Sequence, residues 1–320
     1  MSQVREILDR LQTLGVEPTG VADDSRQVRA GDLFLAYPGD LSDGRRYIAD
    51  AIARGAIAVI WQAGGDFAWN PALTVANLHM DSLRALAGPL AHAVYGHPSE
   101  GLSLIAITGT NGKTTISQFV ARAYAKPCAV IGTLGAGFPG ALVETGFTTP
   151  EATTLMRYLA DFREQRAAAC ALEASSIGIE EGRMNGARVD VAVFTNLSRD
   201  HLDYHGNMES YAAAKQKLFM WDGLQTSIIN ADDAFGSELI ATLKTQHKSC
   251  LSYGFEMADI SASDLQLHDS GLSMTVKTPQ GVALLSATVI GGFNAYNFLS
   301  VLATLLAFKV ELSKAVSVIA

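Results

Sequence analysis

The feature that most constrains this chain lies at residues 102–124, where the sequence reads LSLIAITGTNGKTTISQFVARAY. An apolar run breaks into a loop that contains Gly112, Lys113 and Thr114, and the loop opens directly into an amphipathic segment. This order predicts a strand, a loop and a helix that begins near Lys113. Backbone N–H groups of such a loop converge on phosphate oxygens, and the helix N-terminus adds its dipole to the same anion site.

The loop therefore predicts binding of a nucleoside triphosphate. Lys113 would place a charge beside the transferable phosphate, and Thr114 or Thr115 would offer a hydroxyl to Mg2+. The standard phosphate-loop pattern has glycine where Ile107 stands, so it fails at one position. The flanking strand and helix favour a nucleotide site over a tight glycine turn without function. The loop residues expected to contact ATP are Gly109, Thr110, Asn111, Gly112, Lys113, Thr114 and Thr115.

Composition indicates the class of protein and its compartment. With 320 residues, 48% hydrophobic and 18% charged, the chain is expected to form about two globular domains. A net charge of -8 argues against nucleic acid as a partner. The charged start lacks the apolar core of a signal peptide, and no run approaches the ~20 apolar residues of a membrane span, so we expect a cytoplasmic protein without membrane insertion. Cys170 and Cys250 fall in predicted strands, Cys128 directly precedes one, and all three are expected to be buried free thiols.

Periodicity and chain breakers divide the sequence into two blocks at the segment 96–101. The first block, residues 1–96, alternates helix and strand and is expected to be a small α/β domain. Its predicted helices cover residues 3–14, 45–54 and 82–95, and its predicted strands cover residues 32–37, 56–61 and 73–76.

The second block, residues 97–320, is expected to be a doubly wound, mostly parallel sheet, because its strands are short continuous apolar runs. Alternating runs over 259–290 predict an added antiparallel meander, and a helix is expected to start around Asn294. The other predicted strands cover residues 129–132, 169–174, 189–195, 227–230 and 249–253, and further helices begin near Glu151, Ser210 and Ser237.

Polar groups follow the predicted parallel strands, where ligands collect in open α/β sheets. Glu173 ends one strand, and a carboxylate beside a phosphate loop is a usual Mg2+ ligand, with a solvated strand-end glutamate as the alternative. The segment 196–206, NLSRDHLDYHG, follows the next strand. Taken alone, this segment is also compatible with zinc. Asp and His without Cys, beside a nucleotide loop, favour Mg2+ and phosphate chemistry.

Several ordered motifs resemble the signatures of the Mur ligases, the ATP-dependent amide-forming enzymes of peptidoglycan precursor synthesis. They are TGTNGKTT at 108–115, EASS at 173–176, NLSRDHLDYHG at 196–206 and NAYN at 294–297. The first block resembles the N-terminal domain shared by the MurE and MurF branches, through DSR at 24–26, GDLFLA at 31–36 and DGRRY at 43–47. The string DHLDYHG, with TTPE at 148–151, resembles the MurE branch specifically. The resemblance covers essentially the whole chain.

The resemblance implies an enzyme that adds a diamino acid to UDP-N-acetylmuramoyl-L-Ala-D-Glu through an acyl phosphate. The diamino acid is either meso-diaminopimelate, which we favour, or L-lysine, and the sequence does not decide between them. It implies that residues 1–96 bind the UDP substrate, that residues 97–320 bind ATP and Mg2+, and that the protein is a monomer. The residues implied to contact the UDP-muramoyl dipeptide are Ser25, Asp40, Leu41, Ser42, Thr148, Thr149, Ser175, Glu181 and Arg183. The implied catalytic set is Lys113, Glu173, His201 and Lys215, the implied metal ligands are Thr114, Glu173, His201 and Lys215, and Asn294 and Asn297 would approach the adenine.

Three points qualify this assignment. Ile177 and Glu181 stand where many members of the MurE branch have His and Gln, so secondary substrate contacts are expected to differ. Lys215 matches a lysine that the family carbamylates to make an anionic metal ligand, whereas the sequence alone predicts an ordinary lysine on a helix surface. Family members also continue into a third domain that completes the ATP site, and this sequence ends in the apolar segment 312–320. We expect that domain to be absent here, and the chain alone to bind the UDP substrate without turnover.

The alternatives within the same class are a MurF-type ligase and a folylpolyglutamate synthase. The motif at 148–150 disfavours the first, and the motif at 24–26 disfavours the second. An alternative of another class is a fragment that binds a UDP-sugar and a nucleotide without catalysis.

Overall fold

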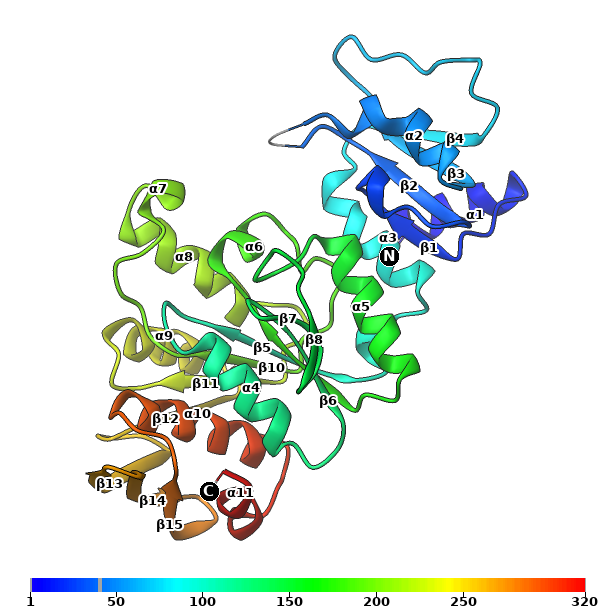
Figure 1. Ribbon diagram of the computed structural model, residues 1–320. Helices are drawn as coiled ribbons and strands as arrows, with labels where there is room; N and C mark the ends of the chain where they lie inside the picture. Colours follow the sequence, from blue (N-terminus) through cyan, green and yellow to red (C-terminus); the bar gives the residue numbers. More distant parts are fainter. Residues whose placement is uncertain (1, 40–41, 320) are drawn as a thin grey trace. The chain divides into compact units, whose positions relative to one another are not determined.

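The computed structural model describes residues 2–39 and 42–319 (Figure 1). The chain divides into two compact units, and both are α/β. The first unit is Met1–Gly101 with Pro150–Glu164 and Gly182–Ala187, and the second is Leu102–Thr149 with Gln165–Glu181 and Arg188–Ala320. The first unit therefore includes two segments that lie beyond residues 96–101 in the sequence.

The first unit is built on a four-stranded parallel sheet in the order β1-β2-β3-β4. Its strands are β1 (Gly20–Ala22), β2 (Asp32–Ala36), β3 (Ala58–Gln62) and β4 (Ala76–Met80). Its helices are α1 (Ser2–Thr13), η1 (Ser25–Gln27), η2 (Gly44–Tyr47), α2 (Ile48–Ala53), α3 (Arg84–Val94), η3 (Pro98–Glu100) and α5 (Ala152–Glu164). The prediction of a strand at 73–76 was wrong in position, because pairing with β3 begins at Ala76. β4 is an edge strand in which only Leu78 is buried, so its apolar signal is weak.

The buried side chain of Arg157 ties α5 to the sheet of the first unit. Its guanidinium donates to the Tyr95 hydroxyl at 3.0 Å, to the Val21 carbonyl at 3.0 Å and to the Asp32 carboxylate at 3.1 Å. The Tyr95 hydroxyl also accepts a hydrogen bond from the Val21 N–H at 3.1 Å. One phenol oxygen thus serves two donors from two elements.

We predict that Tyr95→Phe lowers the free energy of unfolding by about 1–2 kcal/mol, because Arg157 and Val21 both lose an acceptor while the ring is kept. Chemical denaturation followed by far-UV circular dichroism measures the effect. Tyr158→Phe on α5 is the matched control, since the Tyr158 hydroxyl makes no hydrogen bond to the described residues. Equal stability of the two variants would show that the Tyr95 hydroxyl contributes nothing.

The second unit is built on an eleven-stranded sheet in the order β15-β14-β13-β12-β11-β10-β5-β9-β6-β7-β8. Strands from β13 to β6 in this order pair in parallel, and β13-β14-β15 and β6-β7-β8 are antiparallel. The strands are β5 (Ser103–Thr108), β6 (Cys128–Gly132), β7 (Gly135–Phe138), β8 (Ala141–Val143), β9 (Ala169–Glu173), β10 (Val191–Phe194), β11 (Thr226–Asn230), β12 (Cys250–Gly254), β13 (Ile260–His268), β14 (Gly271–Thr278) and β15 (Gly281–Ala287). The predicted parallel strands and meander are confirmed, whereas the short glycine-containing strands β7 and β8 were not predicted.

The helices of this unit are α4 (Lys113–Ala123), α6 (Ser176–Glu180), α7 (Leu202–His205), α8 (Met208–Phe219), α9 (Ala234–Thr245), α10 (Phe293–Ala307) and α11 (Leu312–Ile319). Helices α4 and α10 lie side by side (Figure 1) and pack on one sheet face. Ile107 of β5, Ile116 of α4 and Phe298 of α10 belong to one buried cluster. None of the helices in the described ranges is long and apolar enough to span a membrane.

Strand β5 lies where the strand order changes direction. The chain proceeds from β5 to β6 and β9 on one side, and then to β10, β11 and β12 on the other. Loops at such a switch point leave room for a ligand at the carboxyl ends of the strands. The fold therefore places the loop after β5 at the expected ligand position. The three cysteines are free; Cys128 and Cys170 are buried, and Cys250 is only partly buried.

Candidate nucleotide and metal site

The loop between β5 and α4 is held in a fixed shape by the end of β10. Gly109 and Gly112 have φ angles of +141° and +90°, a region that favours glycine. The Asn111 N–H donates to Asn196 Oδ1 at 3.0 Å, and Thr195 Oγ1 donates to the Asn111 carbonyl at 2.6 Å. These bonds orient the loop backbone before any ligand binds.

Two lysine ammonium groups converge on one carbonyl of this loop. Lys113 Nζ donates to the Gly109 carbonyl at 2.8 Å and to the Thr110 carbonyl at 2.9 Å. Lys215 Nζ, from α8, donates to the same Gly109 carbonyl at 3.1 Å. Burial lowers the pKa of Lys113, with Glu173 and Asp200 acting in the opposite direction. The Lys113 ammonium beside the N-terminus of α4 makes a site that suits a polyphosphate anion.

Lys215 is buried, with 1% of the residue exposed, so its prediction as an ordinary surface lysine was wrong. Its ammonium lies 4.3 Å from the centre of the Tyr211 ring. Burial, followed by the charge of Lys113, lowers the pKa of Lys215 to about 7. A lysine with this pKa is substantially neutral near physiological pH, and a neutral amine is the form that reacts as a nucleophile.

Glu173, at the end of β9, is also almost fully buried and is surrounded by hydroxyl donors. Thr114 Oγ1 donates to its carboxylate at 2.8 Å, and Thr133 donates through Oγ1 at 3.0 Å and through N–H at 3.2 Å. A hydroxyl and a carboxylate in contact are oxygen donors of the kind that Mg2+ prefers. Thr133 was not singled out from the sequence, although its place directly after strand β6 was the available signal.

The remaining predicted nucleotide-site residues lie around this centre in different ways. His201 is half-exposed, and its Nε2 lies 3.6 Å from Asp200 Oδ2. Its ring meets the Tyr211 ring edge-on. In the described part of the chain, Glu173 and His201 do not form a group of three His, Cys or carboxylate ligands. Asn294 and Asn297 are buried and joined by a 2.9 Å hydrogen bond. Asn297 lies against Gly112, where a Cβ would approach its Oδ1 to 2.7 Å.

The predicted substrate residues fall in both units. In the second unit, Thr149 Oγ1 donates to the Glu173 carbonyl at 2.7 Å and accepts from the Ser175 N–H at 2.9 Å. Thr148 Oγ1 is 3.1 Å from Thr133 Oγ1, and Glu181 accepts from the Tyr204 hydroxyl at 3.4 Å. In the first unit, Ser25 is buried, Ser42 is exposed, and Arg183 pairs with Glu151 at 3.3 Å. Asp40 and Leu41 lie outside the described residues.

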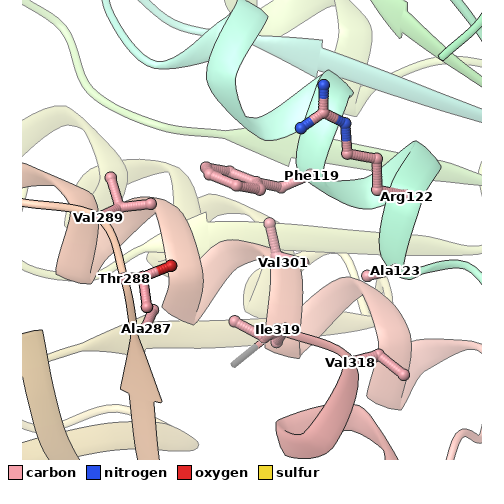
Figure 2. Close-up of a pocket in the computed structure, with 9 residues that line it drawn as sticks. All are labelled: Phe119, Arg122, Ala123, Ala287, Thr288, Val289, Val301, Val318 and Ile319. Atoms are coloured by element: carbon pink, nitrogen blue, oxygen red, sulfur yellow. The ribbon is translucent and has the colours of Figure 1, made fainter. Parts of the chain in front are cut away.

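A pocket of about 180 Å³ lies elsewhere in the second unit, among α4, α10, α11 and the end of β15 (Figure 2). Phe119 and Val301 are among its lining side chains, and the Arg122 guanidinium extends away from Val301. None of the predicted site residues lines it. The candidate site is therefore defined by the hydrogen bonds of the loop rather than by this pocket.

Comparisons with known proteins match both blocks of the sequence. The profile of the Mur ligase middle domain matches residues 107–305, and that of the Mur ligase family, catalytic domain, matches residues 17–95. The UDP-N-acetylmuramoyl-L-alanyl-D-glutamate--2,6-diaminopimelate ligase of Chromobacterium violaceum is 45% identical over 313 residues, which are 97% of this chain and 64% of that protein. The chain therefore spans less than two thirds of this relative's length.

Solved structures show the same likeness. A structure of a UDP-N-acetylmuramoyl-L-alanyl-D-glutamate--2,6-diaminopimelate ligase has a TM-score of 0.81 at 33% identity, covering 94% of this chain and 62% of that one. MurF ligase from Thermotoga maritima in complex with ADP shares the fold, with a TM-score of 0.63 at 16% identity and coverage of 93% and 65%. The middle-domain profile alone covers more than half of the sequence, including the loop, Glu173 and Lys215. This chain belongs to the Mur ligase family.

Proposed function

We propose that the protein containing this chain is an ATP-dependent amide ligase of peptidoglycan precursor synthesis. Its substrates would be UDP-N-acetylmuramoyl-L-Ala-D-Glu and a diamino acid, meso-diaminopimelate rather than L-lysine. The name of the Chromobacterium violaceum relative, at 45% identity, supports this choice of substrates. In this proposal the protein acts as a cytoplasmic monomer, the N-terminal domain at 1–96 binds the UDP substrate, and the central domain at 97–320 binds ATP.

The single observation that carries the proposal is the convergence of Lys113 and Lys215 on the Gly109 carbonyl. This pair of ammonium groups lies beside the contact between Thr114 and Glu173 and at the N-terminus of α4. An anion with several phosphate groups is the ligand that matches the Lys113 ammonium and a helix N-terminus. A neighbouring hydroxyl–carboxylate pair matches the Mg2+ ion that accompanies such an anion.

The residues have distinct roles in the proposed reaction. The γ-phosphoryl group of ATP passes to the D-Glu side-chain carboxylate, which gives an acyl phosphate and ADP. The amine of the diamino acid then attacks the acyl carbon, and amide and inorganic phosphate are formed. Lys113 and the loop N–H groups stabilise the charge that develops on the transferring oxygens. Because a carboxylate is already a competent nucleophile, positioning by the loop supplies much of the rate.

Four residues would hold Mg2+: Thr114, Glu173, His201 and Lys215. The ion would neutralise charge on the phosphate oxygens during transfer. Lys215 would contribute as a carbamate, formed when its neutral amine adds to CO2 with loss of one proton. Burial, followed by the charge of Lys113, lowers the pKa of Lys215, and carbamylation would replace the amine by an anion that the Lys113 ammonium attracts.

The predicted substrate residues would contact three different parts of the substrates. Thr148, Thr149, Ser175, Glu181 and Arg183 would contact the muramoyl dipeptide, and Ser25 with residues 40–42 would lie along the uridine nucleotide. Asn294 and Asn297 would approach the adenine. The hydrogen bonds of Thr149 with Glu173 and Ser175 support this assignment, because they link the candidate substrate residues to the candidate metal ligand.

Phosphate release measured with and without the UDP-muramoyl dipeptide tests the proposal. We expect release by the whole protein to require ATP, Mg2+, the dipeptide substrate and diaminopimelate together, and to be weaker with L-lysine. Phosphate release that is independent of the UDP substrate would contradict the proposal. Binding of the substrate without release under all conditions would favour a non-catalytic binding protein.

A further inference from the structure

A second group of ligand side chains lies in the first unit, apart from the phosphate loop. His92 is on the last turn of α3. His97 directly precedes η3, and Glu100 is the last residue of η3. One ligand atom from each of these residues lies within 4.8 Å of the others. Among residues 2–39 and 42–319, no other group of three His, Cys, Asp or Glu side chains has its ligand atoms this close together.

We propose that His92, His97 and Glu100 bind a divalent transition-metal ion of the Zn2+ type. The two Nδ1 atoms are 3.2 Å apart and share a hydrogen bond, whose proton a bound metal ion would displace. Two nitrogens bound at 2.0–2.1 Å to a tetrahedral Zn2+ are separated by about 3.3 Å, so the imidazoles already have the required spacing. Glu100 Oε1 is 3.8 Å from His97 Nδ1, and the Glu100 side chain is half-exposed.

The chain fixes the orientation of the buried ligand. His92 Nε2 is 2.8 Å from Ser99 Oγ, so an Nε2 proton can be donated to the hydroxyl while the Nδ1 lone pair is directed at His97. A hydrogen bond from the second ring nitrogen is the usual support for a metal-bound histidine.

The backbone brings the second histidine to the first. His97 has a φ angle of +55°, and its N–H donates to the His92 carbonyl at 2.8 Å. The two rings meet edge-on, with centroids 4.8 Å apart. The site therefore joins the end of α3 to the segment that leads into β5.

Charge around the site is mixed. Arg163 donates to the Tyr95 carbonyl at 2.9 Å and to the Gly96 carbonyl at 2.6 Å, and its positive charge opposes a cation nearby. Glu100 supplies the compensating negative charge. Two nitrogens and one carboxylate, with a remaining position open to water, suit Zn2+, Co2+ or Ni2+ better than Mg2+, which prefers oxygen ligands.

Titration of metal-free protein with Co2+, in buffer that contains Mg2+ to occupy oxygen-rich sites, tests the inference. We expect visible absorption bands of a low-symmetry Co2+ site that saturate at one ion per chain and disappear on addition of Zn2+. The Zn2+-bound protein is expected to melt at a higher temperature than the metal-free protein, because the ion binds the folded state.

Two variants and one control identify the ligands. His97→Asn, which tolerates the left-handed backbone, and Glu100→Gln should each weaken Zn2+ binding by about tenfold or more. His247→Asn is the matched control, because His247 is an exposed histidine with a φ angle of +54°. Absence of Co2+ bands, or equal Zn2+ affinity in His97→Asn and His247→Asn, would overturn the proposal. This outcome is independent of the proposed ligase activity, because none of these residues belongs to the nucleotide site.

Discussion

Lys113→Met is expected to reduce kcat/KM of the whole protein by roughly 30- to 150-fold, which corresponds to about 2–3 kcal/mol of lost transition-state stabilisation. The variant keeps the aliphatic stem of the side chain and removes the ammonium that lies beside the Gly109 and Thr110 carbonyls. The lost charge acts most strongly when negative charge accumulates on the transferring phosphoryl group. The affinity for an ATP analogue, measured by isothermal titration calorimetry, should therefore fall less than kcat/KM.

Lys126→Met is a suitable control, because Lys126 follows α4 and lies outside the phosphate loop. Lys126→Met should unfold at the same temperature as the original protein, and activity is measured well below the unfolding temperature of Lys113→Met, which loses two hydrogen bonds. Unchanged turnover in Lys113→Met would contradict the proposal that this loop binds the phosphates of ATP.

Lys215→Met is expected to reduce activity by about 100-fold or more, because it removes a proposed metal ligand. A small carboxylate such as acetate should restore part of the activity by supplying the missing anion. The protein labelled with 13CO2 should show a carbamate carbon by NMR, and Lys215→Met should not. Lys217→Met is the matched control, since Lys217 lies on the same helix, is half-exposed and pairs with Glu180 at 2.6 Å.

The pH dependence provides a second test of Lys215. In buffer freed of CO2, where Lys215 carries no carbamate, its pKa is about 7 in the folded chain and near 10.5 in the unfolded chain. Between these values the unfolded chain binds a proton that the folded chain does not, so the stability of the original protein should rise with pH from about 7 to 10.5. At pH 6 the buried charge destabilises the fold, and Lys215→Met should be the more stable protein. If both proteins show the same pH profile and the same activity, Lys215 is neither perturbed nor catalytic.

Much of the fold could be predicted because the strands of the second unit are continuous apolar runs. β5, β9 and β10 are buried on both faces, and such strands are recognised from composition alone. β1, β7 and β8 have three or four residues and contain glycine or lie near it, so they carry no periodic signal. The strand was predicted at 73–76 because apolar residues precede Ala76. Strand β4 begins at Ala76 instead, because its pairing with β3 begins there.

The sequence predicted some features of the candidate site and missed others, and each outcome has a physical reason. Lys113 and Thr114 belong to a contiguous motif, so a single segment indicates their role. The burial of Lys215 was missed, although Tyr211, Lys215 and Leu218 follow the i, i+4, i+7 spacing of one helix face. That pattern places Lys215 in an apolar stripe and was the available signal. The donation from Thr133 to Glu173 joins residues forty positions apart, and only the pairing of β6 with β9 brings them together.

The most direct test of the proposed chemistry follows oxygen from the substrate. The D-Glu side-chain carboxylate of the UDP-muramoyl dipeptide is labelled with 18O in both oxygens, and the whole protein is supplied with ATP, Mg2+ and diaminopimelate. If an acyl phosphate is formed, each amide made is accompanied by one inorganic phosphate that carries a single 18O atom, which mass spectrometry detects. Amide formation with unlabelled phosphate, or with 18O in AMP, would contradict the account, as would the absence of any amide product.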